Sequence, residues 1–429
     1  MDDMHSSVSA IQISYSDTNG GAARAAFRLH RAFRDTIVDS RMLVQQRQHD
    51  DPSIIGPQGK LRAGLGLLRA SLSGLPALLK NTSDPTLHSY GWLPSGRDRL
   101  INGMGVDVVN LHWVGWDMLS ITEIAKIKKP LVWTLHDMWA FCGTEHYAPD
   151  TSEARWRLGY TKENRDAEVQ GLDLGRLAWQ RKRNNWRHSF QIVTPSNWLA
   201  NCVKNSALMH DWPIEVIPNP LDIDVFKPID RNFACEALNL PSSRKYVLFG
   251  AIGGGKDLRK GFDLLQHALL QLAETWPHEL SCIVCGQSEP LDVPDIGFPI
   301  IWMGHVHDDW SLALLYNVAD VVAVPSRQEN LPQMATEAMA CGVPVVAFNT
   351  TGLPDVVDHK KNGYLAISFD SSDLALGIEW VLEDDNRRCH LGEQARHKAV
   401  ENWAHPVVAA RYRALYESLL TLESEAKGY

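Results

Sequence analysis

Short apolar runs recur along the chain, and stretches with helical periodicity or turn residues separate them. Such near-continuous apolar runs are typical of strands that a parallel sheet buries on both faces. The pattern therefore predicts an α/β protein with a helix over 406–422. The first expected strand, at 9–16, alternates apolar and polar residues. The others lie at 107–113, 130–136, 192–198 (with a helix start), 245–252, 280–286 and 300–305, in the apolar run that ends at Pro325, and at 343–348.

The length of the chain and the placement of its prolines indicate two domains. A chain of 429 residues is too long for one ordinary core and suits two α/β domains. The segment 216–228 has the proline density of a domain linker. We read Asp222 and Asp224 inside it as linker residues, because an isolated acidic pair is weak evidence for a metal.

Composition excludes several function classes. A net charge of -9 argues against a general nucleic-acid binder. The N-terminus shows no signal-peptide pattern, and no run approaches the roughly 18 apolar residues of a membrane span. Seven scattered cysteines favour a reducing cytosol. We interpret Cys282 and Cys285 as strand residues, because both lie inside an apolar run.

The stretch 324–348 carries the strongest chemical pattern. Glu329 follows an apolar run, where open α/β sheets bind ligands, and Glu337 lies between one and two turns into the next helix. Glu329 can accept hydrogen bonds from sugar hydroxyls, and Glu337 can accept them from a ribose. With Pro332 in the first turn, the amides of 331–333 can face a diphosphate. Alternatively, both carboxylates only complement the helix dipole.

Two glycine-rich loops follow expected strands. Gly20 and Gly21 come after the first strand, and residues 253–261 come after the strand at 245–252. Glycines let the backbone approach phosphates closely, and Lys256, Arg259 and Lys260 add positive charge without a metal.

Two expected strands deliver a histidine near their carboxyl ends, His112 and His136. The second continues into the aromatic-rich segment 137–147, which suits the wall of a cleft. A single histidine here would usually be a packing residue, whereas two at the ends of separate strands favour a site.

Two basic stretches allow two interpretations each. Leucines interleave with Lys60, Arg62, Arg69 and Lys80. The segment could lie on an anionic membrane surface, or form a helix that uses its leucines for the core. The stretch 176–188 could neutralise an acceptor phosphate or lipid headgroups, or be a solvated helix face with inward tryptophans.

The stretch 324–348 closely resembles the donor-sugar motif of family 4 retaining glycosyltransferases of GT-B fold, in which two glutamates separated by seven residues flank the nucleotide sugar. Lys260-Gly261 matches the phosphate-binding lysine of that family. Gly255 stands where the family usually has arginine, and Lys256 is the nearest substitute. His136 matches a histidine lining the sugar-transfer centre, and its surroundings resemble bacterial exopolysaccharide transferases of the colanic-acid type.

This resemblance implies two Rossmann-like domains facing across a cleft: an acceptor-side domain over 1–220, with a C-terminal helix over 404–429 packing back onto it, and a donor-binding domain over 221–403. It implies a cytoplasmic, metal-independent, retaining transferase without a cofactor. The enzyme would move a sugar from a nucleotide sugar to a glycan or lipid-linked acceptor in bacterial surface polysaccharide synthesis. A lipid-linked acceptor favours peripheral attachment to the inner face of the plasma membrane.

The implied catalytic residues are His136, Lys260 and Glu329. The implied donor-binding residues are Gly20, Gly21, Gly254, Lys256, Lys260, Glu329, Asn330, Leu331, Pro332 and Glu337, and the implied acceptor-binding residues are His112, Asp137 and Trp139. Two alternatives stay open: a GT-B nucleotide-sugar epimerase and a non-catalytic glycan-binding subunit.

Overall fold

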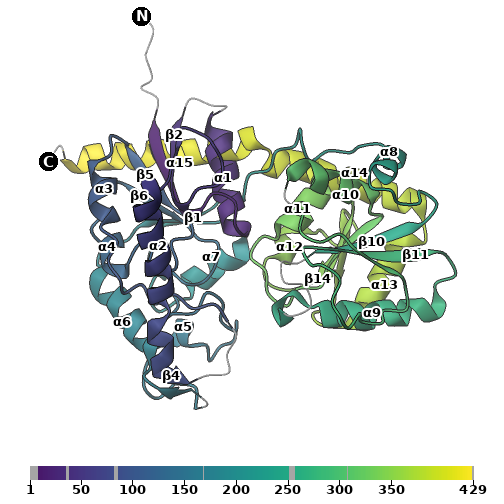
Figure 1. The fold of residues 1–429 in the computed structure, drawn as a ribbon, viewed down its shortest axis with the longest axis horizontal. Coiled ribbons are helices and arrows are strands. Elements are labelled where there is room, and N and C mark those ends of the chain that lie inside the picture. The colour runs from purple at the N-terminus through teal and green to yellow at the C-terminus, as the bar shows by residue number, and fades with distance from the viewer. Residues whose placement is uncertain are drawn as a thin grey trace, which may run out of the picture. The chain divides into compact units, whose positions relative to one another are not determined.

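The computed structural model describes residues 8–34, 38–81, 86–167, 169–250, 257–306 and 308–427. The chain separates into two compact units (Figure 1). Unit 1 comprises residues 1–220 and 408–429, and unit 2 comprises residues 221–407.

Unit 1 is built on a seven-stranded parallel sheet in the order β3-β2-β1-β5-β6-β8-β9. The strands are β1 (Ser9–Ser16), β2 (Asp39–Gln46), β3 (Ile54–Ile55), β5 (Val108–Leu111), β6 (Leu131–Thr134), β8 (Gln191–Thr194) and β9 (Ile214–Val216). Because β1, β5 and β6 are neighbours, the loops at their carboxyl ends meet at one edge of the sheet. All three strands were expected from the sequence.

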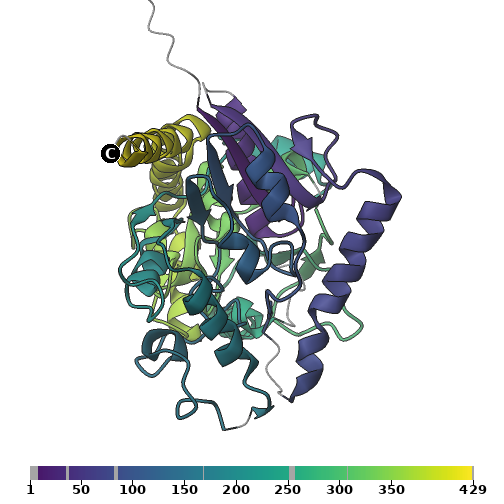
Figure 2. The ribbon, with the colours of Figure 1, turned by 90° about the vertical axis from the view of Figure 1, so that its left-hand side faces the viewer.

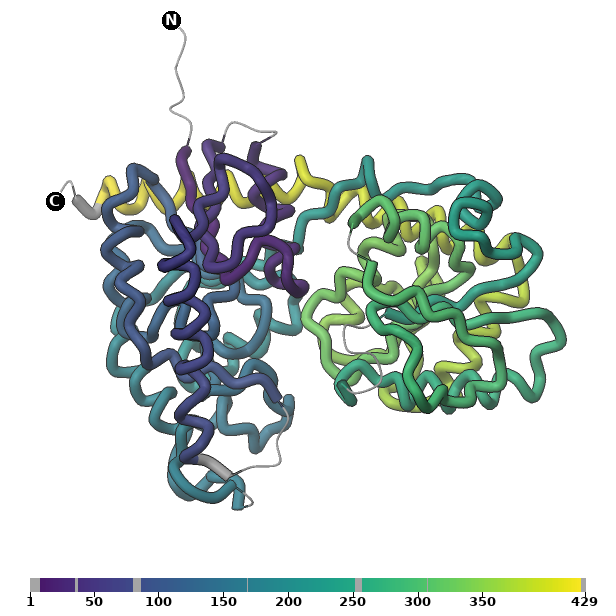
Figure 3. The backbone as a smooth tube through the Cα atoms, in the orientation of Figure 1, coloured from purple at the N-terminus to yellow at the C-terminus, as the bar shows by residue number. Residues whose placement is uncertain are grey.

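Helices cover this sheet. They are α1 (Gly21–Arg34), α2 (Gly59–Ser73), α3 (Arg97–Gly103), α4 (Ile121–Ile124), α5 (Arg155–Leu158), α6 (Leu174–Asn185) and α7 (Asn197–Lys204), with a 3-10 turn at Leu75–Leu79 and an antiparallel pair of β4 (Lys80–Asn81) and β7 (Gln170–Gly171). From residue 408 onward, the last helix, α15 (His405–Lys427), packs Tyr412 and Tyr416 against Phe33 of α1 and the sheet. The backbone trace in Figure 3 follows α15 as the last segment of the chain.

Helix α2 packs with its small residues inward and its leucines outward. Gly66 lies over Gln45 of β2 so closely that a Cβ atom would clash with that side chain, and Ala70 packs against the core. Leu61, Leu65, Leu68 and Leu72 are spaced to form one stripe and remain 79%, 55%, 54% and 38% exposed. The interpretation that these leucines serve the core is therefore wrong. Figure 2 shows α2 on the outside of unit 1.

Unit 2 contains a six-stranded parallel sheet in the order β12-β11-β10-β13-β14-β15. The strands are β10 (Lys245–Gly250), β11 (Leu280–Cys285), β12 (Ile300–Trp302), β13 (Val321–Val324), β14 (Val345–Phe348) and β15 (Gly363–Ala366). Cys282 and Cys285 both belong to β11, which confirms their interpretation as strand residues.

Apolar clusters flank the sheet of unit 2. Its helices are α8 (Arg231–Ala237), a 3-10 turn η3 (Leu258–Lys260), α9 (Phe262–Thr275), α10 (Asp309–Val318), α11 (Gln333–Ala340), α12 (Leu353–Val356), α13 (Ser371–Leu382) and α14 (Asp385–Trp403). The expected parallel α/β fold is confirmed. Across the residues that the structure describes, no helix is long and apolar enough to span a bilayer.

Candidate active site

Glu329 lies in the loop after β13 and is tied to three neighbours. Its Oε1 accepts hydrogen bonds from Lys260 Nζ at 2.5 Å and from Ser326 Oγ at 3.1 Å. Its backbone N–H donates to Thr351 Oγ1 at 3.0 Å, which fixes the loop. The glutamate is 8% exposed, so its carboxylate is largely withdrawn from water and held by a charged partner.

Lys260 reaches Glu329 because the backbone of Gly261 approaches the end of β13. Gly261 adopts φ +69°, and a Cβ atom there would lie 1.9 Å from the carbonyl oxygen of Pro325. Only glycine combines that conformation with so close an approach. The Lys-Gly pair therefore places a cation beside the glutamate that the sequence pattern assigns to the donor sugar.

Glu337 is buried in α11, and Tyr316 of α10 donates its hydroxyl hydrogen to Glu337 Oε2 at 2.6 Å. Burial, reinforced by the negative charge of Glu337, raises the pKa of Tyr316 well above its ordinary value, so the tyrosine remains a donor. A buried carboxylate one turn into a helix fits the expected position of Glu337.

The start of α11 corrects one detail of the sequence prediction. The helix begins at Gln333, and Pro332 is its N-cap residue rather than a member of its first turn. Proline has no N–H, so among residues 331–333 only Leu331 and Gln333 have backbone donors. Asn330 and Leu331 are both buried in the loop before the helix.

Two expected donor ligands, Gly254 and Lys256, lie outside the described residues. The Asp222 carboxylate accepts hydrogen bonds from the backbone N–H groups of Asp224 and Val225, which gives Asp222 a structural role in a turn. In the described part of the chain, no group of three His, Cys, Asp or Glu side chains is arranged to hold a metal.

In unit 1, Gly20 and Gly21 lie where β1 turns into α1. Gly20 has φ +90° and its carbonyl accepts from Arg24 N–H at 3.1 Å, while Gly21 is the first residue of the helix. The turn thus needs glycine at position 20 and brings backbone, without side chains, to the carboxyl end of β1.

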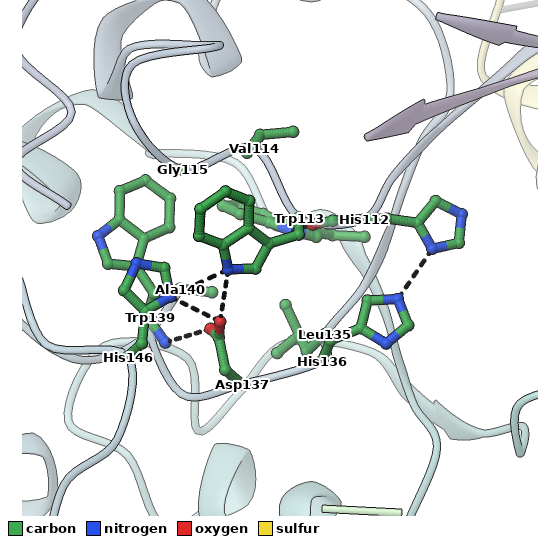
Figure 4. Close-up of a pocket in the computed structure, with 11 residues that line it drawn as sticks. His112, Trp113, Val114, Gly115, Leu135, His136, Asp137, Trp139, Ala140 and His146 are labelled. Atoms are coloured by element: carbon green, nitrogen blue, oxygen red, sulfur yellow. Dashed lines mark hydrogen bonds and ion pairs between the residues drawn. The ribbon is translucent and has the colours of Figure 1, made fainter. Parts of the chain in front are cut away.

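His112 and His136 follow β5 and β6 and contact each other directly (Figure 4). His112 Nδ1 lies 3.0 Å from His136 Nε2, and His112 Nε2 lies 3.0 Å from Gln12 Oε1. Burial lowers the pKa of His136 to about 4, against the opposing charge of Asp137. Burial and the neighbouring His136 lower the pKa of His112 well below its ordinary value, so both rings are neutral at pH 7.

Asp137 organises a second network beside the histidine pair (Figure 4). Its Oδ2 lies 2.6 Å from His146 Nδ1 and accepts the indole N–H of Trp113 at 2.9 Å. Burial raises the pKa of Asp137, but His146 and the backbone N–H of Trp139 outweigh burial and leave the pKa below its ordinary value. Asp137 is therefore an anion at pH 7.

His146 connects Asp137 to Ser89, with 2.8 Å between His146 Nε2 and Ser89 Oγ. The order Asp–His–Ser is that of a hydrolase triad, but Ser89 is only 2% exposed. Its hydroxyl also accepts from Trp116 N–H at 3.3 Å. We therefore interpret the network as a set of structural hydrogen bonds that hold the loop after β6 in place.

Trp139 and Lys182 fix the rest of that loop. The indole of Trp139 donates to the carbonyl of Ser89 at 2.7 Å. The ammonium group of Lys182 donates to the carbonyls of Trp139, Cys142 and Gly143 and lies 4.0 Å from the centroid of the Trp139 ring. Lys182 is fully buried, and Trp179 of α6 and Trp186 at the C-cap of α6 are buried as well, so this segment has the inward tryptophans that one interpretation expected.

The structure brings together two sets of the expected residues: Lys260 with Glu329 in unit 2, and His112 with His136 and Asp137 in unit 1. A pocket is lined by these last three residues with Trp113, Trp139 and His146. Sequence reasoning missed Gln12, Ser89 and Tyr316. The sequence feature that could have pointed to Gln12 is its position as a polar residue between the apolar residues of an expected strand.

Two protein-family models match the chain. The model described as Glycosyltransferase Family 4 covers residues 19–225, and the model described as Glycosyl transferases group 1 covers residues 237–398. The D-inositol 3-phosphate glycosyltransferase of Corynebacterium jeikeium is 33% identical over 222 residues, which is 48% of this chain and 52% of that protein. The chain thus spans about half the length of this curated relative.

Solved structures share the fold at low sequence identity. The sucrose-phosphate synthase of Thermosynechococcus elongatus superimposes with a TM-score of 0.64 at 18% identity, covering 97% of this chain and 100% of that one. Anabaena Alr3699/HepE, solved with UDP and glucose, gives 0.62 at 18% identity over 96% and 100%. With two Rossmann-like sheets of the GT-B fold and both family models in sequence along it, the chain belongs to the family 4 glycosyltransferases, a retaining family.

Proposed function

We propose that the protein transfers a sugar, with retention of anomeric configuration, from a nucleotide sugar to a glycan or lipid-linked acceptor in bacterial surface polysaccharide synthesis. The observation that carries this proposal is the contact between Lys260 and Glu329 at the carboxyl end of β13. This contact brings together the ammonium group of Lys260, which can bind a diphosphate, and the carboxylate of Glu329, which can accept hydrogen bonds from sugar hydroxyls.

Each residue of this site has a distinct role. Lys260 stabilises the negative charge that grows on the nucleoside diphosphate as the glycosidic bond breaks. Glu329 accepts hydrogen bonds from the donor sugar, and Glu337 accepts them from the ribose. The N–H groups of Leu331 and Gln333 at the start of α11 add donors for phosphate oxygens.

In unit 1, His136 contacts the donor or acceptor sugar, and Gly20 and Gly21 allow the donor diphosphate and the acceptor to approach the backbone. Asp137 and Trp139 shape the acceptor side through the loop that they hold. Because Lys260 supplies positive charge to the leaving group, we expect transfer without a divalent cation. Activity that EDTA abolishes and magnesium restores would contradict this expectation.

A panel of nucleotide sugars tests the proposal and its alternatives. UDP-sugars come first, because the Anabaena protein was solved with UDP, and D-inositol 3-phosphate belongs among the acceptors, because the curated relative is named for it. Release of nucleoside diphosphate supports a transferase. An isomerised nucleotide sugar would identify an epimerase, and binding without turnover would identify a glycan-binding subunit.

We also propose that α2 attaches the protein to the inner face of an anionic plasma membrane. Its leucine stripe, Leu61, Leu65, Leu68 and Leu72, faces away from the core of unit 1. Lys60 and Arg62 on the same helix are exposed. An apolar face bordered by cations suits the boundary between acyl chains and anionic headgroups. A lipid-linked acceptor would be confined to that surface.

Sedimentation with vesicles tests this attachment. Each cation beside an anionic bilayer contributes about 1 kcal/mol, so binding should need anionic lipid and weaken with added salt. Leu65→Ser with Leu68→Ser should abolish it. The matched control, Leu291→Ser with Leu376→Ser, alters two exposed leucines of unit 2 and should bind normally. Absence of binding at low salt, or equal binding by both double variants, would refute the role of α2.

A further inference from the structure

A line of hydrogen-bonding side chains connects the last helix to His136. Tyr416 of α15 lies inside unit 1, where the Asn110 side-chain amide donates to its hydroxyl oxygen at 3.0 Å. Gln12 Nε2 donates to the same oxygen at 3.5 Å, and Gln12 Oε1 lies 3.0 Å from His112 Nε2. His112 Nδ1 then meets His136 Nε2.

Three neighbouring strands position this line. Gln12 of β1 is paired in register with Asn110 of β5, and the backbone N–H of His112 donates to the Ile13 carbonyl at 2.8 Å. His136 follows β6, the next strand of the sheet. Gln12, Asn110, His112 and Tyr416 are all buried, so water does not compete strongly for their hydrogen bonds.

The chemistry of the groups sets the position of each proton. A carbonyl oxygen can only accept, so Gln12 Oε1 requires a hydrogen on His112 Nε2. The neutral His112 ring then has no hydrogen on Nδ1, which must accept. His136 therefore donates from Nε2, and its Nδ1 is the ring nitrogen without a hydrogen.

We propose that Gln12 and His112 are positioning residues that hold His136 in the tautomer protonated at Nε2, so that Nδ1 serves as the hydrogen-bond acceptor for a sugar hydroxyl. The role of His136 toward a sugar hydroxyl rests on the proposed function, whereas the tautomer of His136 does not. The proposal also gives His112 a role through His136 instead of a direct contact with an acceptor sugar, because both ring nitrogens of His112 have partners inside the protein.

The tautomers of His112 and His136 depend on the orientation of the Gln12 side-chain amide. With its nitrogen toward Tyr416, the oxygen faces His112 and the tautomers follow as above. The reverse orientation would place a donor against His112 Nε2, move the His112 hydrogen to Nδ1, and leave His136 protonated at Nδ1. The two arrangements predict opposite spectra.

Nitrogen NMR of the full chain, labelled with ¹⁵N-histidine, reads the tautomer directly. At pH 7.5 the His136 signals, assigned by their loss in His136→Asn, should show a pyrrole-type Nε2 and a pyridine-type Nδ1. A pyrrole-type Nδ1, or an imidazolium ring, would overturn the proposal. The readout needs no turnover. If His136→Asn retained full activity, the role of His136 in transfer would fail while the tautomer could still be judged.

Variants link the tautomer to the reaction. Gln12→Met keeps a similar length but offers His112 no oxygen, so His136 should show both tautomers. The value of kcat should fall about tenfold, the effect of one hydrogen bond, with little change in KM for the donor. An unchanged His136 spectrum in Gln12→Met would refute the proposal.

Two tyrosines of α15 provide a matched pair. Tyr416→Phe removes the anchor of the Gln12 amide and should shift the His136 tautomer toward the mixture. Tyr412→Phe removes a hydroxyl from the same helix, one that pairs with Thr134 Oγ1 at 3.0 Å, and should leave the tautomer unchanged. Equal spectra for the two variants would show that Tyr416 does not fix the orientation of the Gln12 side-chain amide.

Discussion

At the scale of single residues, the candidate site depends on contacts between side chains that are distant in the sequence. Glu329 meets Lys260, Glu337 meets Tyr316, and His112 meets Gln12. The sequence pattern singled out Glu329 and the two histidines because they follow expected strands, and Glu337 because it lies near the start of the next helix, which are local features. It could not identify Gln12 or Tyr316, because only the folded sheet brings them to their partners.

The buried carboxylate of Glu337 leads to a binding prediction. Glu337→Ala should weaken the affinity for nucleoside diphosphate by about 1.5–3 kcal/mol, the cost of losing a charged hydrogen bond to the ribose. Calorimetric titration measures the change. Tyr316→Phe, which retains the carboxylate and loses only its internal donor, should have a smaller effect. Unchanged affinity in Glu337→Ala would rule out the ribose contact.

At the scale of elements, the hydrophobic pattern predicted most of the parallel strands and the helix after Glu329, but it missed β2, β3, β9 and β15. The orientation of α2 could not be predicted, since the usual expectation turns leucines toward the core. The contact of Gly66 with Gln45 reverses that orientation, and it exists only once α2 lies on β2. The exact start of α11 was misplaced by one residue, because proline suits either side of a helix boundary.

The turn between η3 and α9 should depend on Gly261. Gly261→Ala would place a Cβ atom against the Pro325 carbonyl in a left-handed conformation, which alone costs about 1–2 kcal/mol. We expect a lower unfolding temperature and weaker nucleotide binding, because Lys260 moves with this turn. The control is Gly103→Ala, where φ is not positive and no atom lies within 4 Å of the added carbon. Equal stability of the two variants would contradict the constraint.

At the scale of the whole molecule, buried histidines should make stability depend on pH. Burial lowers the pKa of both His30 and His136 to about 4. Unfolding restores an ordinary pKa near 6.5, so the unfolded chain binds more protons as pH falls below that value. Stability should therefore decrease from pH 6.5 to 4, by up to about 3 kcal/mol for each histidine.

A single variant isolates this contribution. Burial raises the pKa of Asp117 to about 6, so the folded chain gains stability at Asp117 as the pH falls below that value. The measured pH dependence of stability is therefore a sum of opposing contributions. His30→Asn removes one titrating group and should reduce the loss of stability between pH 7 and pH 4.5. Urea unfolding at both pH values measures it. An unchanged pH dependence would mean that His30 is not held neutral in the folded state.

The central claim is that Lys260 stabilises the departing nucleoside diphosphate beside Glu329. The most direct test is the steady-state release of nucleoside diphosphate from the preferred donor by Lys260→Ala. Its kcat should fall about 100-fold with a smaller change in KM, as expected for a charge that matters most in the transition state. Lys398→Ala breaks another lysine–carboxylate pair of unit 2, that with Asp358, and should retain the kcat of the unmodified protein. A preserved kcat with only a raised KM in Lys260→Ala would contradict the claim.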